Sequence, residues 1–418
     1  MSRRELPLAG TGWQETQALM AQAHEADQPW HDERAFLGGS YFGGEQVVAI
    51  ANEAYQTYIN YNALFARKMF PSVVRYDEEV VDMVLGLLNA PTTAAGTLTS
   101  GGTESILLGV KTARDWAQSE RPNLVEPEMI VPYAAHPAFH KAAHLMGLKV
   151  VQVGIDGDYR TDVAALASAI NDNTVLLVAS APSYPFGVTD AVNEIAALAV
   201  EHDLWLHVDA CHGGFVLPFA RKLGYQVPDF DFLLEGVCAV SVDIHKLGYA
   251  NKGVSLLALR DSSLREHQRY EFSDWPAGVY ATYGITGSRS SGGVASAWAV
   301  MNTLGTTGYM EIMAPILTAR DRLIGAINDI DGLCVRGTPD AYLISFGSTD
   351  FDIFAVADAL EARGWRSNRL TDPPSIHLFL DAANATNIDA YIEDLTTLTS
   401  AARAGELEAS GKAIVYST

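Results

Sequence analysis

The chain has 418 residues, of which 48% are apolar and 19% are charged, a composition typical of a folded globular protein with more than one structural unit. Its 28 basic and 50 acidic residues give a formal charge of −22, which argues against binding to a nucleic-acid backbone or to an anionic membrane surface. Three cysteines without metal-ligand spacing argue against a disulfide framework or a metal site, and no window approaches the ~20 apolar residues of a membrane span, so we expect a soluble cytoplasmic protein.

The N-terminal region, residues 1–60, is expected to form an arm or entrance segment, because its glycine-rich stretch GGSYFGG lies between two short helical-looking segments. From about residue 95, short apolar runs alternate with amphipathic patterns. The apolar runs are Gly96–Thr99, Met129–Val131, Thr174–Ala179 and Leu204–Val208, and the helical patterns are Glu104–Ala117, Ala138–Met146, Val163–Ile170 and Val192–Glu201. This alternation predicts an α/β fold with a mainly parallel sheet, covered on both faces, in a large domain of residues 61–300.

Two further apolar runs, Gly236–Val240 and Val254–Leu259, are separated by the polar segment SVDIHKLGYANKG. This segment is too short for a helical crossover, so we predict a hairpin-like connection at a sheet edge. After residue 300 the pattern changes to that of a small α+β C-terminal domain, residues 301–418. Its predicted elements are a helix at Ala314–Ile327, a strand at Ala341–Phe346, a helix at Ile353–Arg363 and an apolar run at His377–Leu380.

Polar residues follow three of the apolar runs, where ligands bind in open parallel sheets. In TSGGTES, 99–105, two glycines and a helix beginning near Thr103 would let backbone N–H groups approach an anion, although a simple turn capped by Thr103 explains the same pattern. In LWLHVDACHGGF, 204–215, Asp209 could bind a metal, cap a helix or pair with a buried protonated nitrogen. The small residues after Asp209 leave room for a flat ring.

Two more residues complete a combination that one cofactor requires. Lys246, in the segment after the run at 236–240, would alone be read as a surface charge, and His136, after the run at 129–131, as a structural residue. Pyridoxal 5′-phosphate (PLP) needs a phosphate cradle, a carboxylate, an aromatic face and a lysine amine in one pocket. All four occur here in order at strand ends, which indicates a PLP site.

The motifs also resemble a known family. The segments TSGGTESILLGVKTARDWA, AAHPAFHKAAHLMGLKVV, HVDACHGGF, IHKLGYANKG and GITGSRSSGG are similar to signature segments of the PLP-dependent group II decarboxylases, and most of all to the sphingosine-1-phosphate lyase branch. The similarity runs in order from about residue 38 to residue 380. It implies a fold-type I PLP enzyme that works as a homodimer with active sites shared between the subunits.

The resemblance assigns three catalytic roles. Lys246 would hold the cofactor as a Schiff base, Asp209 would pair with the ring nitrogen, and His136 would stack on the ring. These roles agree with the chemistry, because a carboxylate keeps the ring nitrogen protonated and a stacked ring restricts the cofactor.

The resemblance also assigns the cofactor phosphate and the substrate. Gly102, Thr103 and His245 would hold the phosphate, and Ser288 would reach it from the neighbouring subunit. The implied substrate-binding residues are Tyr41, Lys252 and Tyr280. Two histidines of the lyase branch are replaced here by Phe65 and Phe186, which predicts a smaller or unphosphorylated substrate.

The function expected from these residues is a PLP-dependent lyase that cleaves a bond at Cα of a small amine or amino-acid-like substrate by retro-aldol chemistry. Cleavage of the bond to the carboxylate, which would make the protein an amino-acid decarboxylase, is the alternative. A catalytically silent PLP-binding protein, or a module that binds only an anion at the TSGGTES turn, is a third reading, but neither would need Lys246.

Overall fold

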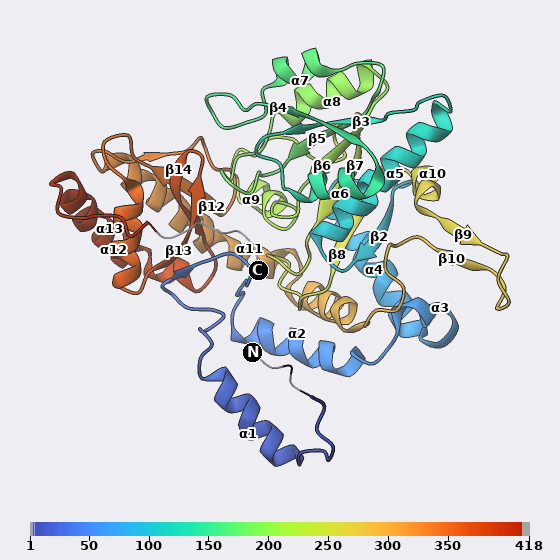
Figure 1. Ribbon diagram of the computed structural model, residues 1–418, viewed down its shortest axis with the longest axis horizontal. Helices are drawn as coiled ribbons and strands as arrows, with labels where there is room; N and C mark the ends of the chain where they lie inside the picture. The colour runs from blue at the N-terminus through green and yellow to red at the C-terminus, as the bar shows by residue number, and fades with distance from the viewer. Residues whose placement is uncertain (1–2, 4, 412–418) are drawn as a thin grey trace.

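The computed structural model describes residue 3 and residues 5–411, and its main feature over that range is a seven-stranded sheet with the order β2-β8-β7-β6-β5-β3-β4 (Figure 1). The strands are β2 (Ala95–Thr99), β3 (Glu128–Pro132), β4 (Lys149–Val153), β5 (Thr174–Ser180), β6 (Trp205–Asp209), β7 (Val237–Val242) and β8 (Ser255–Leu259). Pairing is parallel from β7 to β4, whereas β8 runs antiparallel to both of its neighbours. The predicted mainly parallel sheet is therefore confirmed.

The sheet is buried on both faces, as the apolar strand sequences require. Along β5, Leu176 and Val178 face an apolar cluster that includes α5 (Gly102–Glu120) and α6 (Ala138–Met146). Leu177 and Ala179 point to the opposite cluster, which includes α8 (Val192–Glu201). Successive residues of a strand point to opposite faces, so a strand packed on both faces must be apolar throughout.

The chain turns directly from β7 into the antiparallel strand β8, which confirms the hairpin-like connection predicted for this segment. Because β2 is antiparallel to β8, it runs in the same direction as β7. The carboxyl ends of β2, β3, β5, β6 and β7 therefore lie at one edge of the sheet, and the polar segments singled out in the sequence meet there.

A second sheet, of five strands in the described residues, forms the C-terminal part with the order β1-β13-β14-β12-β11. Its strands are β1 (Ala35–Phe36), β11 (Cys334–Val335), β12 (Leu343–Gly347), β13 (Arg366–Thr371) and β14 (Pro374–Phe379), and its helices are α12 (Ile353–Ala362) and α13 (Ile388–Arg403). The arm contributes β1, which pairs in parallel with β13. The N-terminal region is thus built into the C-terminal sheet.

The element α11 (Gly292–Asp329) joins the two parts and consists of two helical segments that meet at a kink at Gly305. The sequence predicted only its second half, because Gly305, at φ 54°, and the surrounding threonines interrupt the apolar period. The predicted domain boundary at residue 300 falls inside this helix. Two further helices, α2 (Glu45–Tyr58) and α4 (Pro71–Leu87), pack against α11. The outer ends of the predicted arm and C-terminal domain, residues 1, 2, 4 and 412–418, lie outside the described residues.

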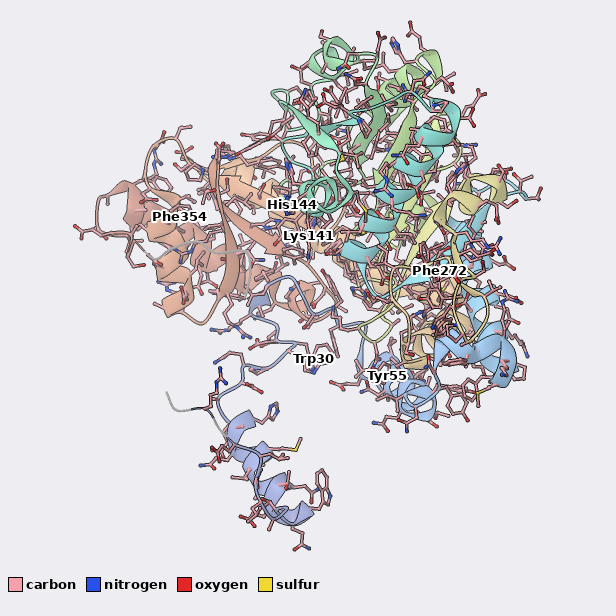
Figure 2. The ribbon with its side chains drawn as sticks, turned by 45° about the vertical axis from the view of Figure 1, so that its right-hand side comes forward. Trp30, Tyr55, Lys141, His144, Phe272 and Phe354 are labelled. Atoms are coloured by element: carbon pink, nitrogen blue, oxygen red, sulfur yellow. The ribbon has the colours of Figure 1, made fainter. Side chains whose placement is uncertain are left out.

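Two elements project from the body. The helix α1 (Trp13–His24) buries none of its residues, and its side chains extend into open space (Figure 2). The hairpin of β9 (Tyr270–Phe272) and β10 (Tyr280–Thr282) likewise exposes apolar side chains, among them Trp275 and Val279. In the part of the chain that the structure describes, no helix has both the length and the apolar character needed to cross a membrane.

Candidate active site

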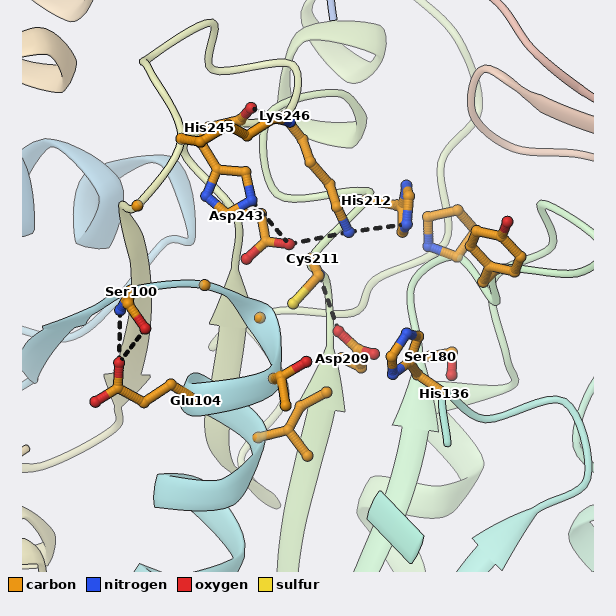
Figure 3. A pocket seen from close by; sticks show the side chains of 18 residues that line it. Ser100, Glu104, His136, Ser180, Asp209, Cys211, His212, Asp243, His245 and Lys246 are labelled. Atoms are coloured by element: carbon orange, nitrogen blue, oxygen red, sulfur yellow. Dashed lines mark hydrogen bonds and ion pairs between the residues drawn. The ribbon is translucent and has the colours of Figure 1, made fainter. Parts of the chain in front are cut away.

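A pocket of about 450 Å³ opens at the carboxyl ends of β5, β6 and β7, beside the N-terminus of α5 (Figure 3). Its wall brings together residues from segments far apart in the sequence. These are Ser100, Gly101, Gly102, Thr103, Glu104, Ile106, His136, Ser180, Pro182, Tyr184, Asp209, Cys211, His212, Asp243, His245, Lys246, Lys252 and Gly253. Seven of the predicted site residues, among them Lys246, Asp209 and His136, therefore line one cavity.

Lys246 extends from the β7–β8 connection into this pocket and has two polar partners (Figure 3). Its Nζ lies 2.9 Å from Oδ2 of Asp243 and 2.8 Å from Nε2 of His212. Burial alone would lower the pKa of Lys246, but Asp243, Tyr41 and Cys211 together outweigh burial and the pKa is raised. The amine is therefore held as an ammonium before it reacts.

Asp243 and His212 were not predicted as site residues. Asp243 is 3% exposed, and its Oδ1 has no hydrogen-bond partner among the described residues. The local signal that could have identified it is its position directly after β7 and three residues before Lys246. His212 carries no such signal, because only the fold brings it to the lysine.

Asp209 ends β6 at the floor of the pocket. Its Oδ1 accepts hydrogen bonds from the backbone N–H of Cys211, at 3.0 Å, and from Oγ of Ser241, at 3.2 Å. The Ser241 hydroxyl also lies 3.1 Å from Nε2 of His207. Burial lowers the pKa of His207 to about 4, so this neighbour is neutral. The carboxylate of Asp209 is thus held through its Oδ1, and neither Ser241 nor His207 in this hydrogen-bond network carries a charge.

His136 follows β3 and lies beside Asp209 (Figure 3). The backbone N–H of Ala138 donates to its Nδ1 at 3.2 Å. Burial lowers the pKa of His136, so the ring is neutral and carries its proton on Nε2. This bond sets the orientation of the imidazole plane next to the carboxylate.

The start of α5 provides an anion cradle. Gly101, Gly102 and Thr103 present the N-terminal backbone of a 19-residue helix to the pocket. A Cβ at Gly102 would lie 2.8 Å from Sγ of Cys211 and 2.9 Å from Oδ2 of Asp243, so only glycine leaves this space open. His245 Nδ1 lies 2.7 Å from the carbonyl of Val254, to which it must donate. Its Nε2 lies 3.9 Å from Oδ2 of Asp243, and both residues line the pocket.

The remaining predicted residues divide into two groups. Tyr41 lines an adjoining hollow of about 310 Å³ that shares His245 and Lys252 with the main pocket. Ser288 and Tyr280 do not line the pocket of their own chain: Oγ of Ser288 accepts from Nδ2 of Asn62 at 2.9 Å, and Tyr280 lies on the projecting hairpin. The prediction that Ser288 serves the neighbouring subunit stays a prediction.

Lys252 lies at the mouth between the two cavities. Its ammonium is 4.7 Å from the ring centre of Tyr41, within the range of a cation–π contact. Burial, followed by the charge of Lys246, lowers the pKa of Lys252 to about 8. The side chain keeps contact with solvent, which moderates this effect. Lys252 therefore places a titratable amine where the two cavities adjoin.

Phe65 and Phe186, which replace two histidines of the lyase branch, both lie away from the pocket of their own chain. Phe186 is buried in a small cluster with Ala134 and Val188, and Phe65 is 48% exposed on the surface. Neither residue lines the pocket or the adjoining hollow of its own chain. The smaller or unphosphorylated substrate predicted from these two replacements therefore gains no support from the pocket that one chain forms, and it stays a prediction.

The chain is similar to known proteins over most of its length. Residues 20–329 match the conserved domain of pyridoxal-dependent decarboxylases. The chain is 40% identical over 398 residues to sphingosine-1-phosphate lyase of Arabidopsis thaliana, across 93% of this chain and 72% of that protein. The structure of Burkholderia pseudomallei K96243 sphingosine-1-phosphate lyase has a TM-score of 0.92 at 38% identity, covering 97% and 94% of the two chains. Lactobacillus brevis glutamate decarboxylase, with a TM-score of 0.82 at 19% identity over 96% of each chain, shares the fold.

The residues of the pocket fit the cofactor that these matches imply. A cradle of helix N-terminal backbone suits a phosphate, and the space at Gly102 must stay free for close approach. The buried Asp209 suits a protonated ring nitrogen, and the lysine amine suits a carbonyl carbon. In the described residues, no group of three or more His, Cys, Asp or Glu side chains is placed to hold a metal ion.

Proposed function

The chain belongs to the pyridoxal-dependent decarboxylase family and is a PLP-dependent lyase, and on this premise we propose that it cleaves the Cα–Cβ bond of a phosphorylated 2-amino-3-hydroxy compound. The products would be an aldehyde and an aminoalkyl phosphate. The observation that carries this choice of substrate is the position of Lys252 at the pocket mouth, where an ammonium can form charge-assisted hydrogen bonds with a phosphate. A decarboxylase substrate without a distal anion would leave Lys252 without this role.

We assign the roles of the chain's residues from their positions. When bound, PLP supplies a ring that accepts the electron pair released at Cα. Asp209 would hold the proton on the ring nitrogen, and His136 would lie against the ring. The N-terminus of α5 and His245 would hold the cofactor phosphate. Lys246 would provide the attaching amine and then carry protons to and from the substrate.

The sphingosine-1-phosphate lyases among the relatives support a long-chain substrate of the same class. The smaller substrate expected from Phe65 and Phe186 has no support from the pocket of one chain, because neither residue lines that pocket. We therefore propose a phosphorylated substrate. The surfaces that adjoin the pocket would determine the length of the substrate's hydrocarbon chain.

The test is a product assay on the purified PLP-loaded protein. Sphingosine-1-phosphate, a short-chain phosphorylated analogue, the unphosphorylated amino alcohol and a panel of amino acids are incubated side by side, and aldehyde and carbon dioxide are measured. The proposal predicts aldehyde from the phosphorylated compounds. Carbon dioxide from an amino acid, with no aldehyde from any phosphorylated compound, would establish the decarboxylase reaction instead.

We also propose that the protein works as a homodimer in which Ser288 and Tyr280 approach the pocket of the partner subunit. The support is that both residues lie outside the pocket of their own chain, in or next to a projecting hairpin with exposed apolar side chains. Light scattering should give twice the mass of one chain. Mixing a Lys246→Ala chain with a Ser288→Ala chain should restore part of the activity, since one of the two pockets in a mixed dimer would be intact. A monomeric active enzyme would contradict the proposal.

A further inference from the structure

His212 connects Lys246 to the aromatic wall of the pocket through two short contacts. Its Nε2 lies 2.8 Å from Nζ of Lys246, and its Nδ1 lies 2.5 Å from the hydroxyl of Tyr342. Both rings are buried, His212 at 8% exposure and Tyr342 at 0%. Tyr342 precedes β12 in the C-terminal part of the chain, so this contact joins the two parts of the molecule at the reactive lysine.

The direction of each hydrogen bond follows from the chemistry of the partners. The Lys246 ammonium can only donate, so Nε2 of His212 must accept. A neutral imidazole then carries its proton on Nδ1, which donates to the oxygen of Tyr342. The ring of Tyr342 lies edge-on to the ring of Tyr41, with 6.3 Å between the ring centres, and Tyr41 lines the hollow that contains Lys252. The four groups therefore lie one after another from the lysine to that hollow.

The surroundings of His212 favour the neutral forms of His212 and Tyr342. Other titratable groups that face His212 or Lys246 are His136, His245, His377, Cys211, Tyr184 and Asp243. Burial, together with the charge of Lys246, lowers the pKa of His212 well below its usual value. Burial raises the pKa of Tyr342. An imidazolium and a phenolate are both disfavoured here, so a proton can pass only by concerted transfer.

We propose that His212 and Tyr342 form a proton relay that converts the Lys246 ammonium into the free amine that attacks the cofactor. One N–H bond of Lys246 breaks as an N–H bond forms at Nε2 of His212. The Nδ1 proton of His212 passes to the oxygen of Tyr342, the Tyr342 proton passes to Tyr41, and Tyr41 releases its proton to water at the mouth. The imidazole ends in its other tautomer, and the net change is one proton moved from Lys246 to solvent.

His212 contacts a reacting atom, whereas Tyr342 acts through His212 and is a positioning residue for the transfer. Asp243 is a poor acceptor for this proton, because burial would raise its pKa but the charges of Lys246 and His245 outweigh burial and lower it. The relay and the ion pair therefore have opposite effects on Lys246. The ion pair keeps the side chain protonated, and the relay removes a proton from it. The inference rests on the proposed role of Lys246 as the attachment residue.

The test uses the full-length protein after its cofactor has been removed with hydroxylamine and dialysis. PLP is added, and the rate of covalent capture is followed by visible absorbance from pH 6 to pH 9. Tyr342→Phe keeps the ring and removes the acceptor of the Nδ1 proton, and His212→Gln keeps an acceptor for Lys246 but cannot change tautomer. Both variants should capture PLP about 100-fold more slowly at pH 7, and their rates should rise more steeply with pH, because hydroxide must replace the relay.

Controls separate this role from a structural one. Tyr391→Phe removes a buried hydroxyl on α13 that has no hydrogen-bond partner among the described residues and does not line the pocket, and it should capture PLP at the normal rate. Adding imidazole to His212→Gly should restore part of the rate, which a merely structural role would not allow. Lys246→Ala should capture no PLP; if it does, the attachment role fails rather than the relay. Normal rates and an unchanged pH profile in both Tyr342→Phe and His212→Gln would overturn the relay.

Discussion

The pH dependence of phosphate recognition follows from the environment of Lys252. Because burial and the neighbouring Lys246 lower the pKa of Lys252 to about 8, its ammonium is present below that pH and is lost above it. With a pKa of about 8, roughly 90% of the side chain is charged at pH 7 and roughly 10% at pH 9. If only the charged form holds the substrate phosphate, kcat/KM should fall about tenfold per pH unit above pH 8.

The assay compares kcat/KM for a phosphorylated substrate with that for its unphosphorylated analogue, since this parameter reports groups of the free enzyme. The substrate phosphate does not titrate in this window, because its second pKa is about 6. The matched variant is Lys252→Arg, in which the guanidinium stays charged throughout and the decline above pH 8 should disappear. A ratio of the two kcat/KM values that stays constant from pH 7 to pH 9.5 in the unmodified protein would refute the assignment of Lys252 to the phosphate.

Two further predictions concern the cofactor. Asp209→Asn keeps the shape of the side chain but removes the charge beside the ring nitrogen, so the rate should fall by about 100- to 1000-fold with PLP still bound, as measured by turnover and visible absorbance; near-normal turnover would show that the carboxylate is structural. Gly102→Ala places a methyl group 2.8 Å from Sγ of Cys211 and 2.9 Å from Oδ2 of Asp243, so PLP affinity should fall, and the midpoint of thermal unfolding of the cofactor-free protein should fall as well because these side chains must shift. Unchanged PLP binding, measured by equilibrium dialysis, would show that this space is not used.

The parts of the site that lie on one sheet edge could be predicted from the sequence. Asp209 ends β6, and Lys246 follows β7, so each residue is placed by the end of an apolar run. Parallel strands bring their carboxyl ends together, so a local pattern was enough to place these two side chains in one pocket. The same reasoning identified the glycine turn before α5.

The contacts that depend on the rest of the chain could not be predicted in this way. Tyr342 comes from the C-terminal part and Tyr41 from the arm, and nothing in either local sequence indicates that Tyr342 contacts His212 or that Tyr41 lies beside Tyr342. The side-chain positions of Phe65 and Phe186 could not be predicted for a related reason. A residue aligned with a known motif was assumed to face the substrate, although the orientation of its side chain depends on packing with distant segments.

An acidic protein can hold a phosphorylated cofactor because the carboxylates nearest the cradle are already occupied by local partners. Oε2 of Glu104 accepts from the backbone N–H and the hydroxyl of Ser100, at 2.7 and 2.5 Å, and Asp243 pairs with Lys246. The formal charge of −22 is spread over the whole chain, and at physiological ionic strength an exposed charge is largely screened beyond about 8 Å. The potential that a phosphate meets is therefore set by the helix N-terminus and Lys252, so net charge alone does not exclude anionic substrates.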